Sequence, residues 1–276
     1  MSDERALVLG GGGVTGIAWE IGLVHGLARA GVDLSGADLL VGTSAGSVVA
    51  AQLASGVPLE ELYAGQLRAP EGEIPARLGY GTVLRYFAAF ALPGTAERKR
   101  ARLGQAALRA RTVSEAERRA VFQGRLAERG WPERPLRVTA VNAEDGSFAV
   151  FDRDSGAPFL DAVAASCAVP LVWPPVTIDG HRYMDGGMRS VANVDLAAGY
   201  QRVVVLAPVT NAFSRAGRPS AQLAALDARS ILLSPDDAAR KAIGRNVLDP
   251  ARRAVAAEAG LAQGTAVADA VRAVWS

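Results

Sequence analysis

The chain has 276 residues, half of them hydrophobic, and a formal net charge of +2. This length and composition suit one large α/β domain with its own core, and the nearly neutral charge argues against nucleic-acid binding. The single cysteine, Cys167, excludes an intramolecular disulfide. The sequence has neither a signal-peptide pattern nor an apolar stretch of about 18 residues, so we expect a cytoplasmic protein without a membrane-spanning helix.

The N-terminal part of the sequence alternates short apolar runs, glycine-rich loops and helical patterns. Each apolar run is short enough for a buried strand, and each helical pattern follows its loop closely. This order predicts a parallel sheet with helical crossovers. The predicted strands are 6–9 and 38–41, the loops 10–13 and 42–46, and the helices 17–29 and 47–54.

The middle of the sequence has few strand signals. Residues 70–135 carry clustered basic side chains, and 97–119 has a helical pattern. Because no repeat and no Gly/Ser linker divides the sequence, we expect one domain over 1–276 with a helical, basic insertion at about 70–135. Later strands are predicted at 136–142, 148–151, 202–207 and 230–233, a helix at 159–167, and closing helices from 251 onward.

Gly42-Thr43-Ser44-Ala45-Gly46 matches the G-x-S-x-G nucleophile elbow, in which a serine occupies a sharp, strained turn between a strand and a helix. Gly42 and Gly46 fit this motif because side chains there would collide with neighbouring backbone. The turn lifts the serine hydroxyl above the sheet edge, at a helix N-terminus whose dipole favours negative charge. With a strand predicted before it and a helix after it, we expect Ser44 to be a nucleophile.

A second glycine cluster, Gly10 to Gly16, follows the first predicted strand. Consecutive glycines allow several backbone N–H groups to point at one spot, which can hold a phosphate or an oxyanion. The cluster also contains G-x-G-x-x-G from Gly11 to Gly16, so a nucleotide-binding oxidoreductase is an alternative. That alternative needs an acidic residue at the end of the second strand, whereas Asp38 stands at its start.

An activated serine needs a base within hydrogen-bond reach, and the usual base is histidine. The sequence contains only His25 and His181. An α/β-hydrolase triad runs in the order Ser, acid, His, which leaves only His181. The acids that could precede it are Asp152, Asp154 and Asp161. His25 falls within the first predicted helix, where a packing role is more ordinary.

The glycine-rich loop, G-x-S-x-G and Asp185-Gly186-Gly187, in this order, resemble the patatin-like phospholipases. Taken alone, Asp185-Gly186-Gly187 is only a turn signal. Residues 165–170, which read Ala-Ser-Cys-Ala-Val-Pro, and Trp173-Pro174-Pro175 also resemble the family block upstream of its catalytic aspartate. The resemblance therefore spans most of the chain, from Gly10 to Gly187 at least.

The resemblance implies a three-layer α/β sandwich with a mostly parallel central sheet, and a serine acyl hydrolase acting on lipid or other acyl esters. It implies a Ser–Asp dyad of Ser44 and Asp185, which needs no histidine, metal or cofactor. It also implies that the oxyanion loop consists of Gly11, Gly12 and Gly13. Acyl transfer to an alcohol and a catalytically silent binding protein stay open as alternatives.

The glycine cluster departs from the family pattern at two positions. The family loop often reads D-G-G-G-x-R-G, whereas Gly10 and Thr15 here replace the acid and the arginine. The backbone donors of the loop do not depend on either side chain.

Aromatic and basic residues gather between residues 77 and 102. They are Tyr80, Tyr86, Phe87 and Phe90 with Arg77 and Arg85, followed by Arg98, Lys99, Arg100 and Arg102. Rings of such a segment can enter a lipid headgroup layer while its cations meet anionic lipid. We therefore hypothesise peripheral membrane contact through 77–102. The alternative is a core helix at 83–92 followed by a solvated basic face.

Overall fold

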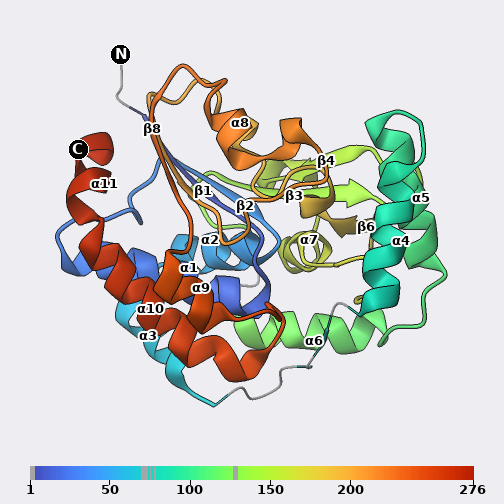
Figure 1. Ribbon diagram of the computed structural model, residues 1–276, viewed down its shortest axis with the longest axis horizontal. Coiled ribbons are helices and arrows are strands. Elements are labelled where there is room, and N and C mark those ends of the chain that lie inside the picture. Colours follow the sequence, from blue (N-terminus) through green and yellow to red (C-terminus); the bar gives the residue numbers. More distant parts are fainter. Residues whose placement is uncertain (1–3, 70–73, 75, 78, 127–129) are drawn as a thin grey trace.

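The computed structural model describes residues 4–69, 74, 76–77, 79–126 and 130–276. Among these residues, eight strands form one mixed, mostly parallel sheet in the order β5-β6-β3-β2-β1-β7-β8, with β4 also paired to β3 (Figure 1). The strands are β1 (Arg5–Leu9), β2 (Leu39–Thr43), β3 (Leu136–Asn142), β4 (Phe148–Phe151), β5 (Val176–Ile178), β6 (His181–Asp185), β7 (Arg202–Leu206) and β8 (Arg229–Leu233).

Helices cover both faces of the sheet, which makes the three-layer α/β sandwich that the resemblance implied (Figure 1). The helices of eight or more residues are α1 (Gly13–Arg29), α2 (Ala45–Ala54), α3 (Leu59–Leu67), α4 (Tyr80–Ala91), α5 (Ala96–Leu108), α6 (Glu115–Arg125), α7 (Phe159–Ser166), α10 (Arg253–Ala266) and α11 (Ala268–Trp275). Two shorter helices are α8 (Pro219–Leu223) and α9 (Asp237–Ile243).

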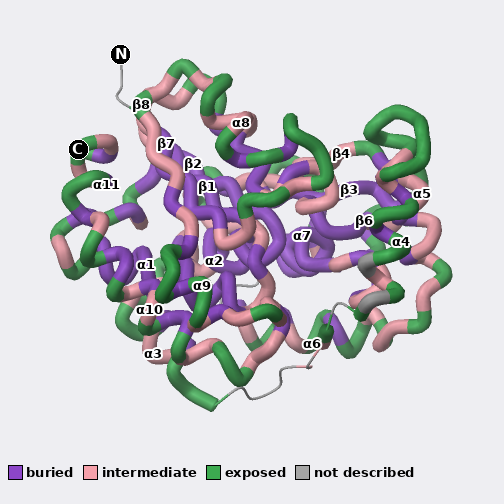
Figure 2. The backbone as a smooth tube through the Cα atoms, viewed as in Figure 1, coloured by how far each residue is buried: buried purple, intermediate pink, exposed green. Residues whose placement is uncertain are grey.

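Side chains alternate along β1, so this strand contributes to a hydrophobic core on each face of the sheet. Leu7 and Leu9 pack into the larger core with residues of α1, α2, α7 and α10. Ala6 and Val8 pack into the smaller core on the other face, which α8 adjoins through Leu223. The central strands and most residues of α1 and α2 are accordingly buried (Figure 2).

Helices α1 and α10 approach closely because glycines face backbone across their interface. An added Cβ at Gly22 or Gly26 would overlap backbone of α10, and one at Gly260 or Gly264 would overlap backbone of α1. This packing fixes α1, which begins at Gly13, the last residue of the glycine loop. The closing helices predicted from residue 251 onward therefore help to hold a helix that adjoins Ser44's cavity through Ile17.

The structure differs from the predicted elements in two places. The single helix predicted at 97–119 is wrong: α5 ends at Leu108, and Ser114 caps a new helix through a reciprocal capping box with Glu117. Strands β5 and β6 were not predicted. They are joined by Asp179 and Gly180, which both have positive φ, and the three residues of β5 are too few to show alternation. None of the helices formed by the described residues has the length and apolarity needed to cross a bilayer.

Candidate active site

Ser44 lies at the turn between β2 and α2 with φ 53° and ψ −120°. A residue with a side chain rarely adopts these angles, so its surroundings must hold it there. Added Cβ atoms at Gly42 and Gly46 would overlap Ser47 and the carbonyl group of Leu9, respectively. The two glycines therefore permit the tight strand-to-helix turn expected of the elbow, and α2 begins at Ala45, earlier than predicted.

Ser44 meets Asp185 because β2 and β6 pair with successive parts of one edge of β3. Thr43, the last residue of β2, pairs with Thr139, and Asp185, the last residue of β6, pairs with the next residue, Ala140. Strand β4 occupies the opposite edge over the same stretch. The two strand ends thus face each other, and Ser44 Oγ donates a hydrogen bond to Asp185 Oδ2 at 2.6 Å.

The Asp185 carboxyl group is buried, and each of its two oxygens accepts a hydrogen bond. It is 3% exposed, and its Oδ1 accepts a 2.7 Å hydrogen bond from the amide of Gly187. Burial raises the pKa of Asp185 to about 7, against the opposing effect of the hydrogen bonds from Ser44 and Gly187. A carboxyl group that titrates near neutrality can both accept and return a proton at physiological pH.

Two side chains at the C-terminal end of α7 hold the peptide groups of Ser44. The Ser166 hydroxyl accepts the Ser44 amide at 2.9 Å, and the Cys167 thiol donates to the Ser44 carbonyl oxygen at 3.1 Å. The hydroxyl of Ser47 donates to the same carbonyl at 2.6 Å. Burial raises the pKa of Cys167 to about 12, so its thiol keeps the proton that it donates. These contacts give residues 165–170 a role that their sequence did not reveal.

A buried asparagine ties the end of β2 to the segment after Asp185. Asn193 has left-handed backbone, and its Nδ2 donates to Thr43 Oγ1 at 3.0 Å and to Thr139 Oγ1 at 3.2 Å. It also donates to the Ser190 carbonyl at 2.9 Å. Sequence reasoning missed Asn193, because a single asparagine outside a motif carries no signal.

At both glycines after Asp185, a side chain would collide with neighbouring atoms of the site. An added Cβ at Gly186 would overlap Thr139, and one at Gly187 would lie 2.9 Å from Asp185 Oδ1. The Asp-Gly-Gly sequence is therefore required by close packing around the carboxyl group. By sequence alone Asp-Gly-Gly indicates only a turn, whereas in the structure close contacts require both of its glycines.

The sequence predicted three amide donors in the glycine loop, and one of them is already hydrogen-bonded within the protein. The amide of Gly11 already donates to the carbonyl oxygen of Val191 at 2.7 Å. Within the described residues, the amides of Gly12 and Gly13 donate to no backbone or side-chain acceptor. Gly13 has φ 61°, and Gly12 and Gly16 both lie against Pro208. The loop thus leaves two amides, at the N-terminus of α1, for an anionic group.

The two histidines lie apart from the Ser44–Asp185 pair. The His25 ring is buried and stacks on Tyr63 at 4.9 Å between centroids, and burial lowers its pKa. His181 is exposed at the start of β6, where its Nδ1 lies 3.2 Å from Glu144 Oε2. Asp161, one of the possible triad acids, forms an ion pair with Arg119. The geometry thus gives no support to a histidine triad.

Two further observations concern the glycine cluster. Asp38 accepts the amide of Arg5 at 2.8 Å, at the end of the sheet where β1 starts. An acid at that end is far from where a dinucleotide ribose would need it. Thr15, which replaces the family arginine, is buried, and its hydroxyl donates to the Val247 carbonyl. Its side chain therefore serves packing against the C-terminal part of the chain.

A small cavity of about 30 Å³ opens beside Ser44. Its lining is mostly apolar and includes Val14, Ile17, Val169 and Trp173. Arg118 of α6 also lines it, with its guanidinium carbon 3.9 Å from the centre of the Trp173 ring. Nothing in the sequence had linked α6 to the site.

A family model described as patatin-like phospholipase matches residues 7–198, and no curated protein matches the sequence. Among solved structures, VipD from Legionella pneumophila has a TM-score of 0.49 at 14% identity, covering 97% of this chain and 67% of VipD. The type III effector protein ExoU has a TM-score of 0.38 at 17% identity, covering 95% of this chain. This chain spans 54% of the length of ExoU.

Proposed function

The chain belongs to the patatin-like phospholipase family and is a lipid ester hydrolase, and on that premise we propose that it cleaves carboxylic esters through an acyl-enzyme formed on Ser44, with Asp185 as the base. One observation carries the proposal: Ser44 Oγ donates at 2.6 Å to a buried carboxyl group whose pKa lies near 7. This is the pairing of nucleophile and base that covalent catalysis requires.

The first half-reaction transfers the acyl group to the protein. Ser44 Oγ attacks the ester carbonyl carbon while its proton passes to Asp185 Oδ2. The amides of Gly12 and Gly13 stabilise the oxyanion, and each such donor is typically worth about 2.7–4 kcal/mol of barrier. When the intermediate collapses, the leaving alkoxide takes the proton from Asp185. The second half-reaction repeats these steps with water as the nucleophile and releases the carboxylic acid.

The elbow contacts support this proposal because they limit how far the nucleophile can move. Ser166, Cys167 and Ser47 all contact the peptide groups of Ser44, so the hydroxyl is held toward Asp185. Preorganisation of this kind reduces the entropy lost in reaching the transition state.

Covalent labelling with a fluorophosphonate tests the assignment most directly. We expect adduct formation on Ser44 in the wild type and none in Ser44→Ala. Turnover of a p-nitrophenyl ester should be lost in Ser44→Ala and nearly lost in Asp185→Asn. His25→Ala and His181→Ala serve as controls that should stay within about tenfold, or roughly 1.4 kcal/mol. A loss in His181→Ala equal to that in Ser44→Ala would replace the dyad with a triad.

We also propose that the outer face of α4 contacts a lipid surface. Leu84 and Phe87 are 67% and 70% exposed, and Leu92, directly after the helix, is 52% exposed. Arg85, which lies between Leu84 and Phe87 in the sequence, and Arg98, which follows Leu92, are exposed as well. Exposed apolar side chains with cations close to them in the sequence suit an anionic lipid–water boundary.

The structure changes which residues of 77–102 belong to that surface. Tyr86 is buried and donates to the Pro170 carbonyl, and Phe90 stacks on Phe213 at 4.1 Å between centroids. Arg100 is also buried, with its Nε donating to the Gly146 carbonyl at 2.7 Å. The side chain of Tyr80 lies outside the described residues. The core helix weighed as the alternative therefore accounts for the inner side of α4 only.

A further inference from the structure

Glu20 is a buried acid that the proposed mechanism does not use. It lies in the middle of α1, is 0% exposed, and accepts the amide of Gly10 through its Oε1 at 3.0 Å. Its Oε2 is buried and has no hydrogen-bond partner among the described residues. Burial raises the pKa of Glu20 well above its ordinary value, against the opposing effect of the Gly10 hydrogen bond. The folded protein therefore favours the neutral carboxyl form.

A carboxyl group at this position lowers the stability of the fold. Burial of a polar atom is unfavourable unless a hydrogen bond replaces those it made with water, and among the described residues Oε2 has none. The amide of Gly10 does not depend on Glu20 either, because the carbonyl oxygen of Leu206 accepts the same N–H at 2.9 Å. A buried polar group that the fold does not require is expected where function requires it.

Glu20 reaches the active site through Gly10. The carbonyl oxygen of Gly10 accepts the amide of Gly46, two residues after Ser44, at 3.0 Å. Gly10 is thus hydrogen-bonded to Glu20 through its amide and to the nucleophile elbow through its carbonyl. Because α1 itself begins at Gly13, this one helix holds the glycine loop at both of its ends.

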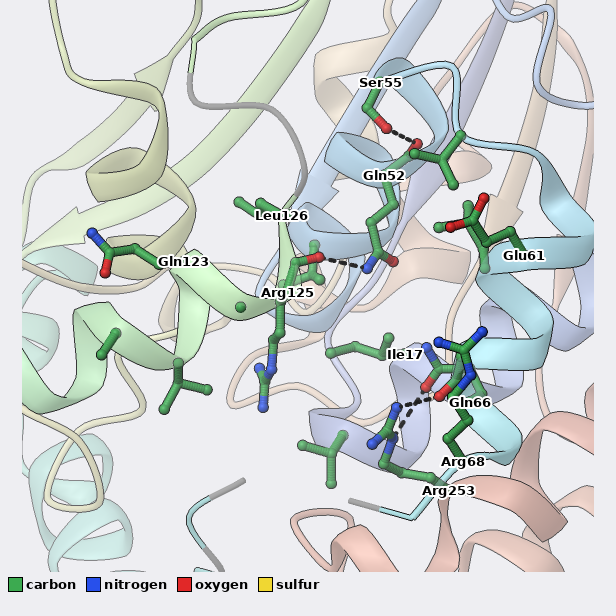
Figure 3. A pocket seen from close by; sticks show the side chains of 18 of the residues that line it. Ile17, Gln52, Ser55, Glu61, Gln66, Arg68, Gln123, Arg125, Leu126 and Arg253 are labelled. Carbon is green, nitrogen blue, oxygen red and sulfur yellow. Dashed lines mark hydrogen bonds between the residues drawn. The ribbon is translucent and has the colours of Figure 1, made fainter. Parts of the chain in front are cut away.

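The Glu20 side chain does not contact the substrate itself. The side of α1 that carries Val14 and Ile17 lines both the cavity of Ser44 and a larger groove between α6, α2 and α3 (Figure 3). Among the described residues that line these two spaces, Glu20 is absent. Any effect of Glu20 on the reaction must therefore pass through the loop that it holds.

We propose that Glu20, through its hydrogen bond to Gly10, holds the oxyanion amides in place beside Ser44. The inference rests on the proposed function, because it takes the oxyanion to form between Ser44 and the glycine loop. Small displacements of such donors reduce their stabilisation of the transition state. A neutral carboxyl group suits this positioning role, since a carboxylate close to the loop would repel the developing oxyanion.

Two substitutions distinguish this role from a purely structural one. Glu20→Met keeps an unbranched side chain but removes the acceptor, whereas Glu20→Gln keeps an amide oxygen to which Gly10 can donate. Glu20→Met should melt at or above the wild-type temperature, because methionine has no polar atom that needs a partner and the Gly10 amide keeps Leu206. Glu20→Gln should melt lower, because its amide nitrogen is buried without an acceptor among the described residues.

Gln263→Leu is the matched control for disturbance of α1. Gln263 is buried in α10, and its Oε1 accepts the indole N–H of Trp19, the neighbour of Glu20, at 3.0 Å. Its side chain has no hydrogen bond to the glycine loop among the described residues. Gln263→Leu should therefore melt below the wild type and keep the wild-type kcat.

The measurement is kcat and KM for a soluble short-chain p-nitrophenyl ester, together with the inhibition constant of a trifluoromethyl ketone, whose adduct on Ser44 carries an oxyanion. Glu20→Met should lower kcat about tenfold or more with a nearly unchanged KM, and should weaken binding of the ketone in the same proportion. Glu20→Gln should restore both values to within about threefold of the wild type.

Wild-type kcat and ketone affinity in Glu20→Met would overturn the inference while leaving Ser44 as nucleophile. An equal loss of kcat in Glu20→Gln or in Gln263→Leu would also overturn it, since the loss would not then follow from the acceptor. Glu20→Leu repeats the test with a second apolar side chain, and failure of both apolar variants to fold would give Glu20 a structural role instead. A wild type that hydrolyses no ester and takes no fluorophosphonate label would overturn the proposed function itself.

Discussion

The amide of Gly11 donates to the carbonyl oxygen of Val191 at 2.7 Å, which anchors the glycine loop to the segment that follows Asp185. The preceding amide, that of Gly10, donates to the Leu206 carbonyl and to the buried carboxyl group of Glu20. The first half of the loop is thus fixed to the sheet end and to α1. Within the described residues, the amides of the second half have no acceptor in the protein, and we expect them to meet the substrate.

Gly12→Ala should lower kcat by about 100-fold, the effect of losing or displacing one oxyanion donor. An added methyl group would overlap Pro208, so the loop must shift away from its present position. The measurement is kcat for a soluble short-chain ester, with the melting temperature as a check of folding. Gly36→Ala, where a methyl group meets open space, should match the wild type. Wild-type kcat in Gly12→Ala would remove Gly12 from the oxyanion site.

The pH dependence of kcat/KM should report the ionisation of Asp185. Its pKa is raised to about 7 by burial, and only the ionised carboxylate can take the Ser44 proton. Below about pH 7, kcat/KM should fall about tenfold per pH unit, and above it the profile should level off. A soluble ester measured between about pH 5 and 9 shows this. A profile that is flat from about pH 5 to 7 would show that another group is the base.

Asp185→Asn should stabilise the protein at high pH more than at low pH. The folded pKa of about 7 exceeds the ordinary value of 3.8, so between these values the folded state holds a proton that the unfolded state has released. The free energy of unfolding therefore falls as the pH rises through this window. Asparagine has no charge to bury, and while its amide oxygen accepts from Gly187, its amide nitrogen can donate to Ser44 in place of the hydrogen bond that Asp185 accepts. The difference in melting temperature between variant and wild type should grow from about pH 4 to 8, and a constant difference would contradict this.

Particular residues show how far the sequence could predict the site. Ser44 and its glycines are predicted by the G-x-S-x-G motif, because close backbone approach restricts those positions to glycine, whereas Asp185 is predicted by the family resemblance. Asn193 and Ser166 could not be found in this way, because they act through contacts between segments distant in the sequence. The hydrogen bond between Ser44 and Asp185 depends on β6, a strand that gave no signal in the sequence.

Asn193→Ala and Asn193→Gly distinguish the role of the Asn193 side-chain amide from the role of its left-handed backbone. Both variants lose the hydrogen bonds to Thr43 and Thr139, but only alanine is strained at φ 51°. Both should unfold about 1–3 kcal/mol more readily in urea and show a lower kcat with a nearly unchanged KM. If glycine restores the wild-type kcat, the amide does not position the site and only the backbone matters.

The lipid contact proposed for α4 should depend on exposed cations and not on Arg100. Arg98 is exposed and Lys99 is half-exposed at the start of α5, whereas Arg100 is buried against Gly146. Arg98→Glu with Lys99→Glu should weaken cosedimentation with anionic vesicles at low salt by about tenfold or more, since each cation near such a surface contributes about 1 kcal/mol and each reversal adds repulsion. Phe87→Gln should weaken binding as well, and this loss should persist at high salt because burial of the ring is not screened.

The matched control reverses Lys241 and Arg245, which are exposed in and just after α9, on another part of the molecule (Figure 1). This pair changes the net charge by the same amount, so equal weakening would show only a general charge effect. Hydrolysis of a soluble short-chain ester should be unchanged in the Arg98–Lys99, Phe87 and Lys241–Arg245 variants, because none of these side chains lines the cavity of Ser44.

Arg100→Glu should instead lower the melting temperature, since it places a second carboxylate beside Glu97 and leaves the Gly146 carbonyl without its donor. Vesicle binding that is lost in Arg100→Glu but kept in the Arg98–Lys99 double variant would place the contact elsewhere.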